Sequence, residues 1–341
     1  MTAASPLTGS AKERFTSALS LVPELGTVES IISSAFASDV RLMREIPAYL
    51  LNLGGKRIRP VLSLLSGKAL GLTIPPQPLL DISAGIELIH MATLLHDDIV
   101  DRSPTRRHQP SPYAKYGTNA TLLSGDFLLT RAFGLCARLD STIITATEQA
   151  CIELVEGEAL ETSLYEDNHT LETSLIIAQR KTASLFRLAA FCASHVAGIS
   201  PERERSMSTF GEQLGVAFQI IDDILDVTSD EATLGKRAGL DIIERKPSAV
   251  NVIWLESGDP RAQRLKTPPP ANQDDENDFV AESLSHLIQG PIIVKARELA
   301  IARAESARTA LRSALESAPE QGGVAGAALE AVIDFAIDRA L

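Results

Sequence analysis

Residues 79–101 read LLDISAGIELIHMATLLHDDIVD, and this stretch decides the fold. Its apolar residues recur at three- and four-residue steps and cover most sides of a helix, through Ile82, Ile86, Ile89 and Leu94. A helix that is apolar on most faces is buried, so we expect this one inside a bundle of other helices. Ser103-Pro104 ends it, which places the acidic pentad Asp97-Asp98-Ile99-Val100-Asp101 at its C-terminal end.

A second acidic pentad, Asp222-Asp223-Ile224-Leu225-Asp226, has the same placement. An apolar helix stripe runs into it from Met207, through Phe210, Leu214, Phe218, Ile221 and Leu225. Residues four apart share a helix face, so Asp97 pairs with Asp101 and Asp222 with Asp226. Hard cations prefer carboxylate oxygen and complete their shell with water and phosphates. Two such pairs facing each other would hold divalent cations, since without metal the carboxylates would repel one another.

A single acidic pattern of this kind in an acidic chain is more often a solvated face. Asp274, Asp275 and Asp278 have the same spacing, but they follow Thr267-Pro268-Pro269-Pro270. Three prolines without apolar periodicity predict a loop. We therefore expect residues 267–280 to form a mobile, acidic, proline-rich loop whose carboxylates face water.

Helical periodicity also dominates the rest of the chain. Further helices are expected at about 26–52, 60–70, 119–138, 141–164, 171–197, 291–317 and 324–340. No glycine-rich phosphate loop follows a strand, which disfavours a nucleotide-binding α/β fold. The 341 residues, 45% of them hydrophobic, suffice for one large domain or two. We expect a single all-α domain over 1–341, with its site between helices and with residues 1–25 flexible.

Composition argues against several classes of protein. The net charge of −12 disfavours broad nucleic-acid binding, which needs a basic surface. No uncharged apolar stretch approaches the roughly 18 residues that span a bilayer, and residues 1–20 lack a signal core. The three cysteines have no ligand spacing, so we expect reduced, packed thiols at Cys136, Cys151 and Cys192. A soluble, cytoplasmic protein is expected.

Three basic clusters lie next to the acidic helix ends. Gly54-Gly55-Lys56-Arg57-Ile58-Arg59-Pro60 precedes a helix, whose N-terminal amides can meet an anion together with these side chains. Arg106-Arg107 lies on an expected loop after the first pentad, and Lys236-Arg237 with Arg245-Lys246 follows the second. One cluster alone is most often a solvated face. Cations alternating with metal-binding carboxylates are what two diphosphates in one cavity would require.

Over roughly residues 50 to 250 the chain resembles the trans-isoprenyl diphosphate synthases, or polyprenyl synthetases. Besides the pentads and the 54–60 cluster, the resemblance rests on His90, Arg106-Arg107, Ser124-Gly125-Asp126, Lys181-Thr182, Phe218-Gln219, Lys236, Gly239, Asp241 and Lys246. It implies an isoprenoid-synthase-type helical bundle around a central cavity, usually in a homodimer. It also implies several Mg²⁺ ions per site and no organic cofactor.

The activity implied by the resemblance is a prenyl transfer between isopentenyl diphosphate and an allylic diphosphate such as farnesyl or geranylgeranyl diphosphate. Breaking the allylic carbon–oxygen bond leaves a carbocation and a diphosphate, whose growing negative charge metals and cationic side chains stabilise. The alkene of isopentenyl diphosphate attacks the cation, and a proton is then lost to the departing diphosphate. No nucleophilic side chain is needed.

The resemblance also implies roles for individual residues. The metal would be held by Asp97, Asp98, Asp101, Asp222, Asp223 and Asp226. Isopentenyl diphosphate would be bound by Lys56, Arg59, His90 and Arg107. The allylic side would be lined by Arg106, Lys181, Thr182, Gln219, Lys236 and Lys246. Catalysis would involve Asp97, Asp101, Arg106, Lys181, Thr182, Gln219, Asp222 and Lys236.

Product length in this family depends on the bulk of the residues just before the first pentad. Ala92 and Thr93 are small, and Ile86 and Ile89 are of medium size, so we expect an all-trans long-chain polyprenyl diphosphate. A shorter-chain geranylgeranyl or farnesyl diphosphate synthase is the alternative. His108 stands where many relatives have glycine, and Pro247-Ser248-Ala249-Val250 also departs from the family pattern, so local loop shape is expected to differ.

Two other functions compete with this one. A class I terpene cyclase shares the first pentad but typically lacks the second diphosphate site and benefits from aromatic walls, whereas aromatic residues are 4% of this chain. A non-catalytic subunit of a heteromeric synthase usually loses acidic or basic residues, and here every matched position is filled. His96 adjoins Asp97 but points another way around the helix, so we expect it to pack or to form hydrogen bonds.

Overall fold

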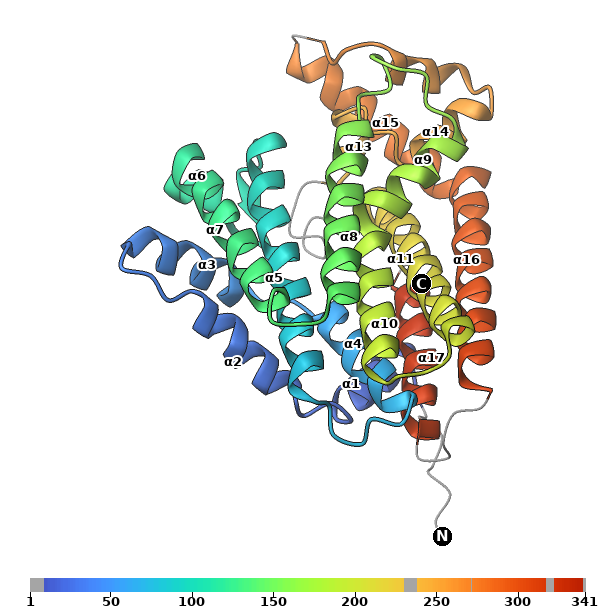
Figure 1. The fold of residues 1–341 in the computed structure, drawn as a ribbon. Helices are drawn as coiled ribbons and strands as arrows, with labels where there is room; N and C mark the ends of the chain where they lie inside the picture. The colour runs from blue at the N-terminus through green and yellow to red at the C-terminus, as the bar shows by residue number, and fades with distance from the viewer. Residues whose placement is uncertain (1–8, 230–237, 271, 317–321, 340–341) are drawn as a thin grey trace.

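The computed structural model describes residues 9–229, 238–270, 272–316 and 322–339. Over these residues the chain is almost entirely helical, which confirms the expected all-α bundle (Figure 1). One two-stranded ribbon interrupts it, where β1 (Thr105–Arg106) pairs antiparallel with β2 (Gln109–Pro110). Lys236, to which the resemblance gives a role at the allylic side, lies outside the described residues.

The helices of the first half are α1 (Ala11–Leu19), α2 (Leu25–Ala35), α3 (Arg41–Asn52), α4 (Ile58–Ala69), α5 (Gln77–Val100), α6 (Pro112–Tyr116) and α7 (Thr118–Cys136). The second half begins with α8 (Ser141–Leu160), α9 (Leu171–Ile177), a π-helical turn (Ala178–Ala183), α10 (Ser184–Val196) and α11 (Pro201–Thr228). It ends with α13 (Leu240–Ile243), α14 (Ala249–Glu256), a 3₁₀ helix (Pro260–Lys266), α15 (Gln273–Gln289), α16 (Pro291–Leu315) and α17 (Gly323–Asp338).

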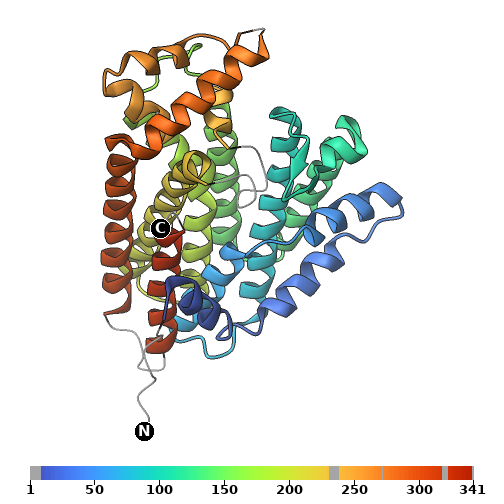
Figure 2. The ribbon, with the colours of Figure 1, turned by 180° about the vertical axis from the view of Figure 1, so that it is seen from behind.

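Two long helices position the site. α5 lies among α2, α4, α7 and α10, and α11 among α10, α16 and α17 (Figures 1 and 2). By length and composition α5 alone among the described helices resembles a membrane span, but 72% of its apolar window is buried, as in a core helix. α11 joins the two hydrophobic clusters of the core, because Phe210 and Leu214 belong to one and Ile220 and Ile224 to the other.

The N-terminal segment 1–25, which was expected to be flexible, contains a packed helix, α1. Ser10 and Glu13 form a capping box at the start of α1, and the ring of Phe15 stacks on that of Phe335 in α17 at 4.2 Å. α2 begins at Leu25. The helix expected over 26–52 is therefore preceded by a further helix, and residues 36–40 divide it into α2 and α3.

The loop expected over residues 267–280 is wrong for residues 273–280, which form the first half of α15. Asn272 caps this helix by accepting a hydrogen bond from the Asp274 N–H at 3.1 Å, and acidic residues in the first turn favour the positive helix end. Phe279 and Val280 are buried against the core. The acidic composition was a helix-start signal, and the prolines end before it.

At one end of the bundle, α14, α15 and the 3₁₀ helix form a cap above the C-terminal end of α11 (Figures 1 and 2). Trp254 of α14 is fully buried and stacks near Phe279 of α15, with 6.4 Å between ring centroids. Both residues belong to the second hydrophobic cluster, which also includes Ile220 and Ile224 of α11, so the cap packs directly against the helix that carries the second acidic pentad.

Candidate active site

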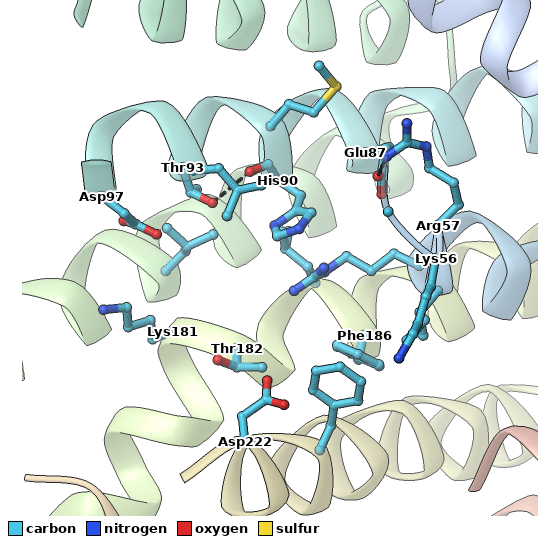
Figure 3. A pocket seen from close by; sticks show the side chains of 18 of the residues that line it. Lys56, Arg57, Glu87, His90, Thr93, Asp97, Lys181, Thr182, Phe186 and Asp222 are labelled. Carbon is cyan, nitrogen blue, oxygen red and sulfur yellow. Dashed lines mark hydrogen bonds and ion pairs between the residues drawn. The ribbon is translucent and has the colours of Figure 1, made fainter. Parts of the chain in front are cut away.

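The two acidic helix ends face one hollow between α5, α8, α10 and α11. A cavity of about 690 Å³ is lined by both Asp97 and Asp222, from opposite walls (Figure 3). A second cavity of about 960 Å³ lies on the side of α11, α13 and α17. The two cavities share the lining residues Lys56, Arg107, Lys181, Thr182, Gln219 and Asp222, so they are compartments of one site.

At the first acidic end, the middle aspartate anchors the β1–β2 ribbon. Asp98 is fully buried, and its Oδ1 accepts from Arg106 Nε at 2.9 Å and Nη2 at 2.8 Å. Arg107 and His108 form the turn with φ of 52° and 63°, a left-handed conformation that suits glycine best. Arg107 reaches back to the Gly54 carbonyl. The ribbon thus ties the end of α5 to the loop before α4.

Burial perturbs the carboxyl group that faces the cavity. Desolvation raises the pKa of Asp97 to about 7, and the positive charge of Lys181 only partly opposes this. A carboxylate in such a position gains stability from an additional cation.

At the second acidic end, backbone N–H groups donate hydrogen bonds to the aspartates, as the Arg106 side chain does at the first end. Asp223 Oδ2 accepts from the Ala249 N–H at 2.8 Å, where α14 begins, and Oδ1 accepts from Gln219 Nε2 at 2.8 Å. Asp226 accepts from the Asp241 N–H at 3.0 Å. Asp222 faces the cavity and pairs with Arg339 at 2.9 Å. Burial raises the pKa of Asp223 above its usual range.

Two lysines join the acidic elements. Lys246 Nζ lies 3.2 Å from Asp101 Oδ1, so it connects the loop after α13 with the end of α5. Lys181 pairs with Glu158 of α8 at 2.7 Å and with Glu161, the residue that follows this helix, at 2.6 Å. Burial alone would lower the pKa of Lys181, but the neighbouring carboxylates outweigh it and hold the pKa above its usual range. Both lysines stay charged.

Close helix packing sets the position of Lys181 and Thr182. A Cβ atom at Gly215 of α11 would lie 2.5 Å from Ala183 Cα, so only glycine lets the two segments approach this closely. The segment that carries Lys181 and Thr182 is π-helical, a distortion that often occurs at functional sites. Thr182 Oγ1 donates to Gln219 Oε1 at 2.6 Å, which links this segment to α11 four residues before Asp223.

A basic region of the first cavity, called the basic compartment below, lies near the start of α4 and the middle of α5. Arg59, His90 and Lys56 line it, and Glu87 balances their charge (Figure 3). Glu87 is buried and pairs with Arg57 at 3.3 Å. Desolvation lowers the pKa of His90 well below its usual range, and nearby arginines add to the effect, so the imidazole is neutral at pH 7. The compartment offers a dense group of donors to an anion.

Most residues proposed for the site line the two compartments. Lining residues are Lys56, Arg59, His90, Asp97, Arg107, Lys181, Thr182, Gln219, Asp222, Asp223 and Lys246. Asp98, Asp101, Arg106 and Asp226 hold the edges of the site through the contacts above and do not line either cavity. His96 lies 3.5 Å from Asp126 and within hydrogen-bond distance of the Leu122 carbonyl, as expected for a residue outside the site.

Several lining residues were not predicted from the sequence. Glu87 lies three residues before His90 on the same face of α5, a spacing that would have identified it. Glu158 and Glu161 have the same three-residue spacing at the C-terminal end of α8. Arg339, near the end of the chain, has no sequence signal, because its partner Asp222 is more than a hundred residues away.

The donor set fits a divalent cation that shares a ligand's phosphate oxygens. Among the described residues, no three acidic, histidine or cysteine side chains lie close enough to hold a metal ion alone. Mg²⁺ is commonly bound through one or two carboxylates plus substrate phosphates. Within the described part of the chain, the buried Asp98 Oδ2 has no hydrogen-bond partner, which is consistent with a missing positive group nearby.

An all-α bundle with opposed acidic helix ends and a basic compartment defines a class of enzyme that ionises or binds diphosphates with divalent metal. Residues 40–285 match the polyprenyl synthetase family model, and the chain therefore belongs to that family. The family expected from the sequence is confirmed.

Known relatives make both long and short products. The chain is 38% identical to octaprenyl diphosphate synthase of Escherichia coli (strain K12) over 247 residues, 72% of this chain and 76% of that protein. It is 36% identical to geranylgeranyl diphosphate synthase of Sulfolobus acidocaldarius over 242 residues, 68% of this chain and 72% of that protein.

A solved structure has the same fold. The polyprenyl synthase of Caulobacter crescentus CB15, complexed with calcium and isoprenyl diphosphate, aligns with a TM-score of 0.83 and 28% identity. The alignment covers 98% of this chain and 99% of that chain. The fold expected from the sequence is confirmed, and a divalent metal and a diphosphate are found together in this relative.

Proposed function

We propose that this protein is a trans-polyprenyl diphosphate synthase that condenses isopentenyl diphosphate with an allylic diphosphate. One observation carries the proposal: Asp97 and Asp222, from two different helices, line the same cavity as Lys181 and the Lys56–Arg59 cluster. A cavity with a carboxylate on each of two opposite walls and two basic regions suits two diphosphates, one seated through metal and one through cationic side chains directly.

The metal-dependent half of the site would receive the allylic substrate. Asp97, Asp101, Asp222 and Asp226 would hold Mg²⁺, which, when bound, supplies electrophilic assistance to the leaving diphosphate. Asp98 and Asp223 orient the two helix ends through Arg106 and the Ala249 N–H. Lys181 and Lys246 remain charged and add fixed positive charge next to the leaving group, which needs no reorganisation during the reaction.

The basic compartment would seat isopentenyl diphosphate. Lys56, Arg59 and Arg107 donate to its diphosphate, and the neutral His90 offers one N–H donor there. Seating its alkene next to the allylic carbon turns a two-molecule encounter into a step within one complex. Carbon–carbon bond formation would move the positive charge onto the isopentenyl carbon skeleton, and loss of a proton from it to the departing diphosphate would then form the new double bond.

A long-chain product is proposed from the wall of the cavity on the α5 side. On α5, Met91, Thr93 and Leu94 line the cavity and none of them is aromatic, whereas Phe186 of α10 and Phe218 of α11 line other parts of it. Ala92, which was expected to face the growing chain, is fully buried and does not line the cavity. The site therefore leaves room at Thr93, where a bulky residue would close the path.

The functional unit is proposed to be a homodimer. Large apolar side chains are exposed on two consecutive helices, α7 and α8: Leu122, Leu123, Phe133, Ile144, Ile152, Val155 and Leu160. Large apolar side chains exposed on neighbouring helices favour an interaction site there. We expect Leu123→Glu/Val155→Glu to produce a monomer in sedimentation velocity, and Ile74→Glu, at an 80% exposed site elsewhere, to leave the dimer intact. An unchanged sedimentation coefficient for the double variant would exclude this face.

We further propose one folded domain that acts in the cytoplasm. Its support is the shared use of α11 by both hydrophobic clusters and the burial of α5.

The activity is tested with the purified protein, isopentenyl diphosphate, farnesyl diphosphate and Mg²⁺. Reverse-phase chromatography of the dephosphorylated products should show a linear series longer than geranylgeraniol. Geranylgeraniol alone would indicate a short-chain synthase, as in the Sulfolobus relative, and cyclic or hydrocarbon products a cyclase. Absence of turnover in the intact dimer would indicate a non-catalytic subunit.

A further inference from the structure

A buried ion pair outside both cavities connects the cap to the site. Arg245 is fully buried, and its guanidinium donates to both oxygens of Glu276 on α15, from Nη1 at 2.6 Å and from Nη2 at 3.0 Å. Nη1 also donates to the Ile242 carbonyl at 2.6 Å and Nε to the Thr267 carbonyl at 3.1 Å. Such a two-pronged pair fixes orientation as well as distance.

The backbone at Arg245 is held in an unfavourable conformation. Its φ is 57°, a left-handed value that residues other than glycine, asparagine and aspartate rarely adopt. Such conformations persist only where the surroundings determine them, and they concentrate at functional sites. Here the side chain is locked by Glu276, and the Arg245 carbonyl accepts from the Leu164 N–H at 2.8 Å.

The turn that Arg245 fixes carries two site groups. The next residue is Lys246, whose Nζ lies 3.2 Å from Asp101 at the first acidic end. The Asp241 N–H, a few residues earlier, donates to Asp226 at the second acidic end. Asn251 closes the turn by donating to the carbonyls of both Asp241 and Lys246, at 3.0 Å each. One turn therefore contacts both metal-binding ends.

We propose that Arg245 and Glu276 are positioning residues, through which helix α15 sets the separation of the two acidic helix ends and the place of Lys246. This inference rests on the proposed function. Neither residue touches substrate. A pair that only stabilised the fold would be replaceable, because buried ion pairs often contribute little net stability. Its geometry matters here because the turn it fixes has a contact at each end.

The test compares Glu276→Gln, which keeps the shape and removes the charge, with Asp278→Asn, an exposed carboxylate on the same helix. Mutations of residues that couple two sites typically change binding by about 3- to 30-fold. We expect Glu276→Gln to raise the KM for the allylic diphosphate and the half-saturating Mg²⁺ concentration within this range. The KM for isopentenyl diphosphate should change less than twofold. Asp278→Asn should match the unmodified protein in both KM values and in the half-saturating Mg²⁺ concentration.

A second measurement does not depend on turnover. Titration of the dimer with inorganic pyrophosphate at fixed Mg²⁺, followed by calorimetry, should show the same weakening for Glu276→Gln. A lower melting temperature with unchanged pyrophosphate affinity would overturn the proposal and leave a purely structural pair. If the unmodified protein makes no prenyl product but binds pyrophosphate, the proposed function fails while the positioning role is still decided by this titration.

A third variant covers the case in which Glu276→Gln does not fold. Glu276→Asp retains the charge but withdraws it by one methylene, so it should fold and show a partial loss of pyrophosphate affinity. Full affinity in a folded Glu276→Asp protein, together with full affinity in Arg245→Lys, would show that the two-pronged geometry is unimportant and would overturn the proposal.

Discussion

The two acidic helix ends have the same spacing of aspartates but are held in different ways. At the end of α5 the middle aspartate, Asp98, is fixed by a side chain, the guanidinium of Arg106. At the end of α11 the equivalent Asp223 is fixed by a backbone N–H, that of Ala249, and by Gln219. Equal motifs therefore do not predict equal tolerance to substitution: the middle aspartate of the first end depends on one charged side chain, and that of the second on the course of the backbone and on Gln219.

The two ends should be equal in one respect, the loss caused by removing a cavity-facing carboxylate. Metal ligation is worth several kcal/mol in the transition state, so Asp97→Ala and Asp222→Ala should each lower kcat about 1000-fold. Steady-state assays on variants with native circular dichroism check this. Asp274→Ala, in the acidic triplet of α15 with the same spacing, should change kcat less than twofold. A large loss at one end alone would mean that only that end binds metal.

The two ends should differ in stability when the middle anchor is removed. Arg106→Ala leaves the buried Asp98 without its cation, and breaking a pair of this kind costs about 3 kcal/mol of unfolding free energy. Asp223→Asn keeps an oxygen that accepts from the Ala249 N–H, so its loss should be nearer about 1 kcal/mol. Urea denaturation of both variants measures the difference.

The matched control for this pair is Arg106→Lys, which restores a positive charge without the fork. It should recover part of the loss if charge matters and little if the geometry of the guanidinium dominates. Equal destabilisation by Arg106→Ala and Asp223→Asn would contradict the distinction between the two ends.

Both ends bury a carboxyl group, and this should appear as a pH dependence in the absence of Mg²⁺. The folded-state pKa of Asp97 is raised to about 7 from 3.8. Between these values the folded protein binds more protons than the unfolded chain, so the free energy of unfolding falls as pH rises, by up to about 1.4 kcal/mol per pH unit. Thermal unfolding from pH 5 to 8 in EDTA measures the slope, which should flatten above pH 7.

Two comparisons isolate the contribution of Asp97. Asp97→Asn should remove its part of the slope and leave that of Asp223, whose pKa burial also raises. Mg²⁺ with pyrophosphate should flatten the curve of the unmodified protein, because a bound cation favours the ionised carboxylate. An identical slope in Asp97→Asn would show that Asp97 ionises normally in the folded protein.

Sequence patterns located the ends of both helices but not what holds them. The α5 and α11 stripes predicted both helices because each buries a continuous apolar face, a local property of the chain. The anchors of Asp98 and Asp223 depend on a ribbon and on a helix start that pack from elsewhere. Arg106 and Gln219 lie within a few residues of their pentads and were predicted as site residues, whereas the Ala249 N–H comes from a distant helix start and was not predicted.

The cap shows where local patterns misled. Prolines at 268–270 suggested a loop through residue 280, yet α15 begins just after them. Its buried residues are recognisable only from their packing against other helices such as α16. Glu276 is an acidic residue in an acidic run, and nothing local distinguishes it from its exposed neighbours. Its burial against Arg245 is a tertiary fact, which is why the positioning pair emerged only from the structure.

The residue four positions before each pentad separates the two ends once more. On α11 this residue is Phe218, which lines the cavity beneath the guanidinium of Arg339, 3.8 Å from the ring centroid. On α5 it is Thr93, which leaves that wall open. Thr93→Phe gives both walls an aromatic ring, and we expect the product to become shorter by several isoprene units while kcat for the first condensation changes only a few-fold. Chromatography of the products from farnesyl diphosphate measures this.

Ala92→Phe is the informative neighbour of that variant. Because Ala92 is fully buried and does not line the cavity, a phenylalanine there should overpack the core by about 1–3 kcal/mol and leave the product distribution of the folded fraction unchanged. The sequence alone predicts both small residues along the path of the growing chain, whereas of these two residues only Thr93 lines the cavity. A shorter product from Ala92→Phe and an unchanged product from Thr93→Phe would mean that the chain grows along another face of α5. The difference between Thr93 and Phe218 would then not determine product length.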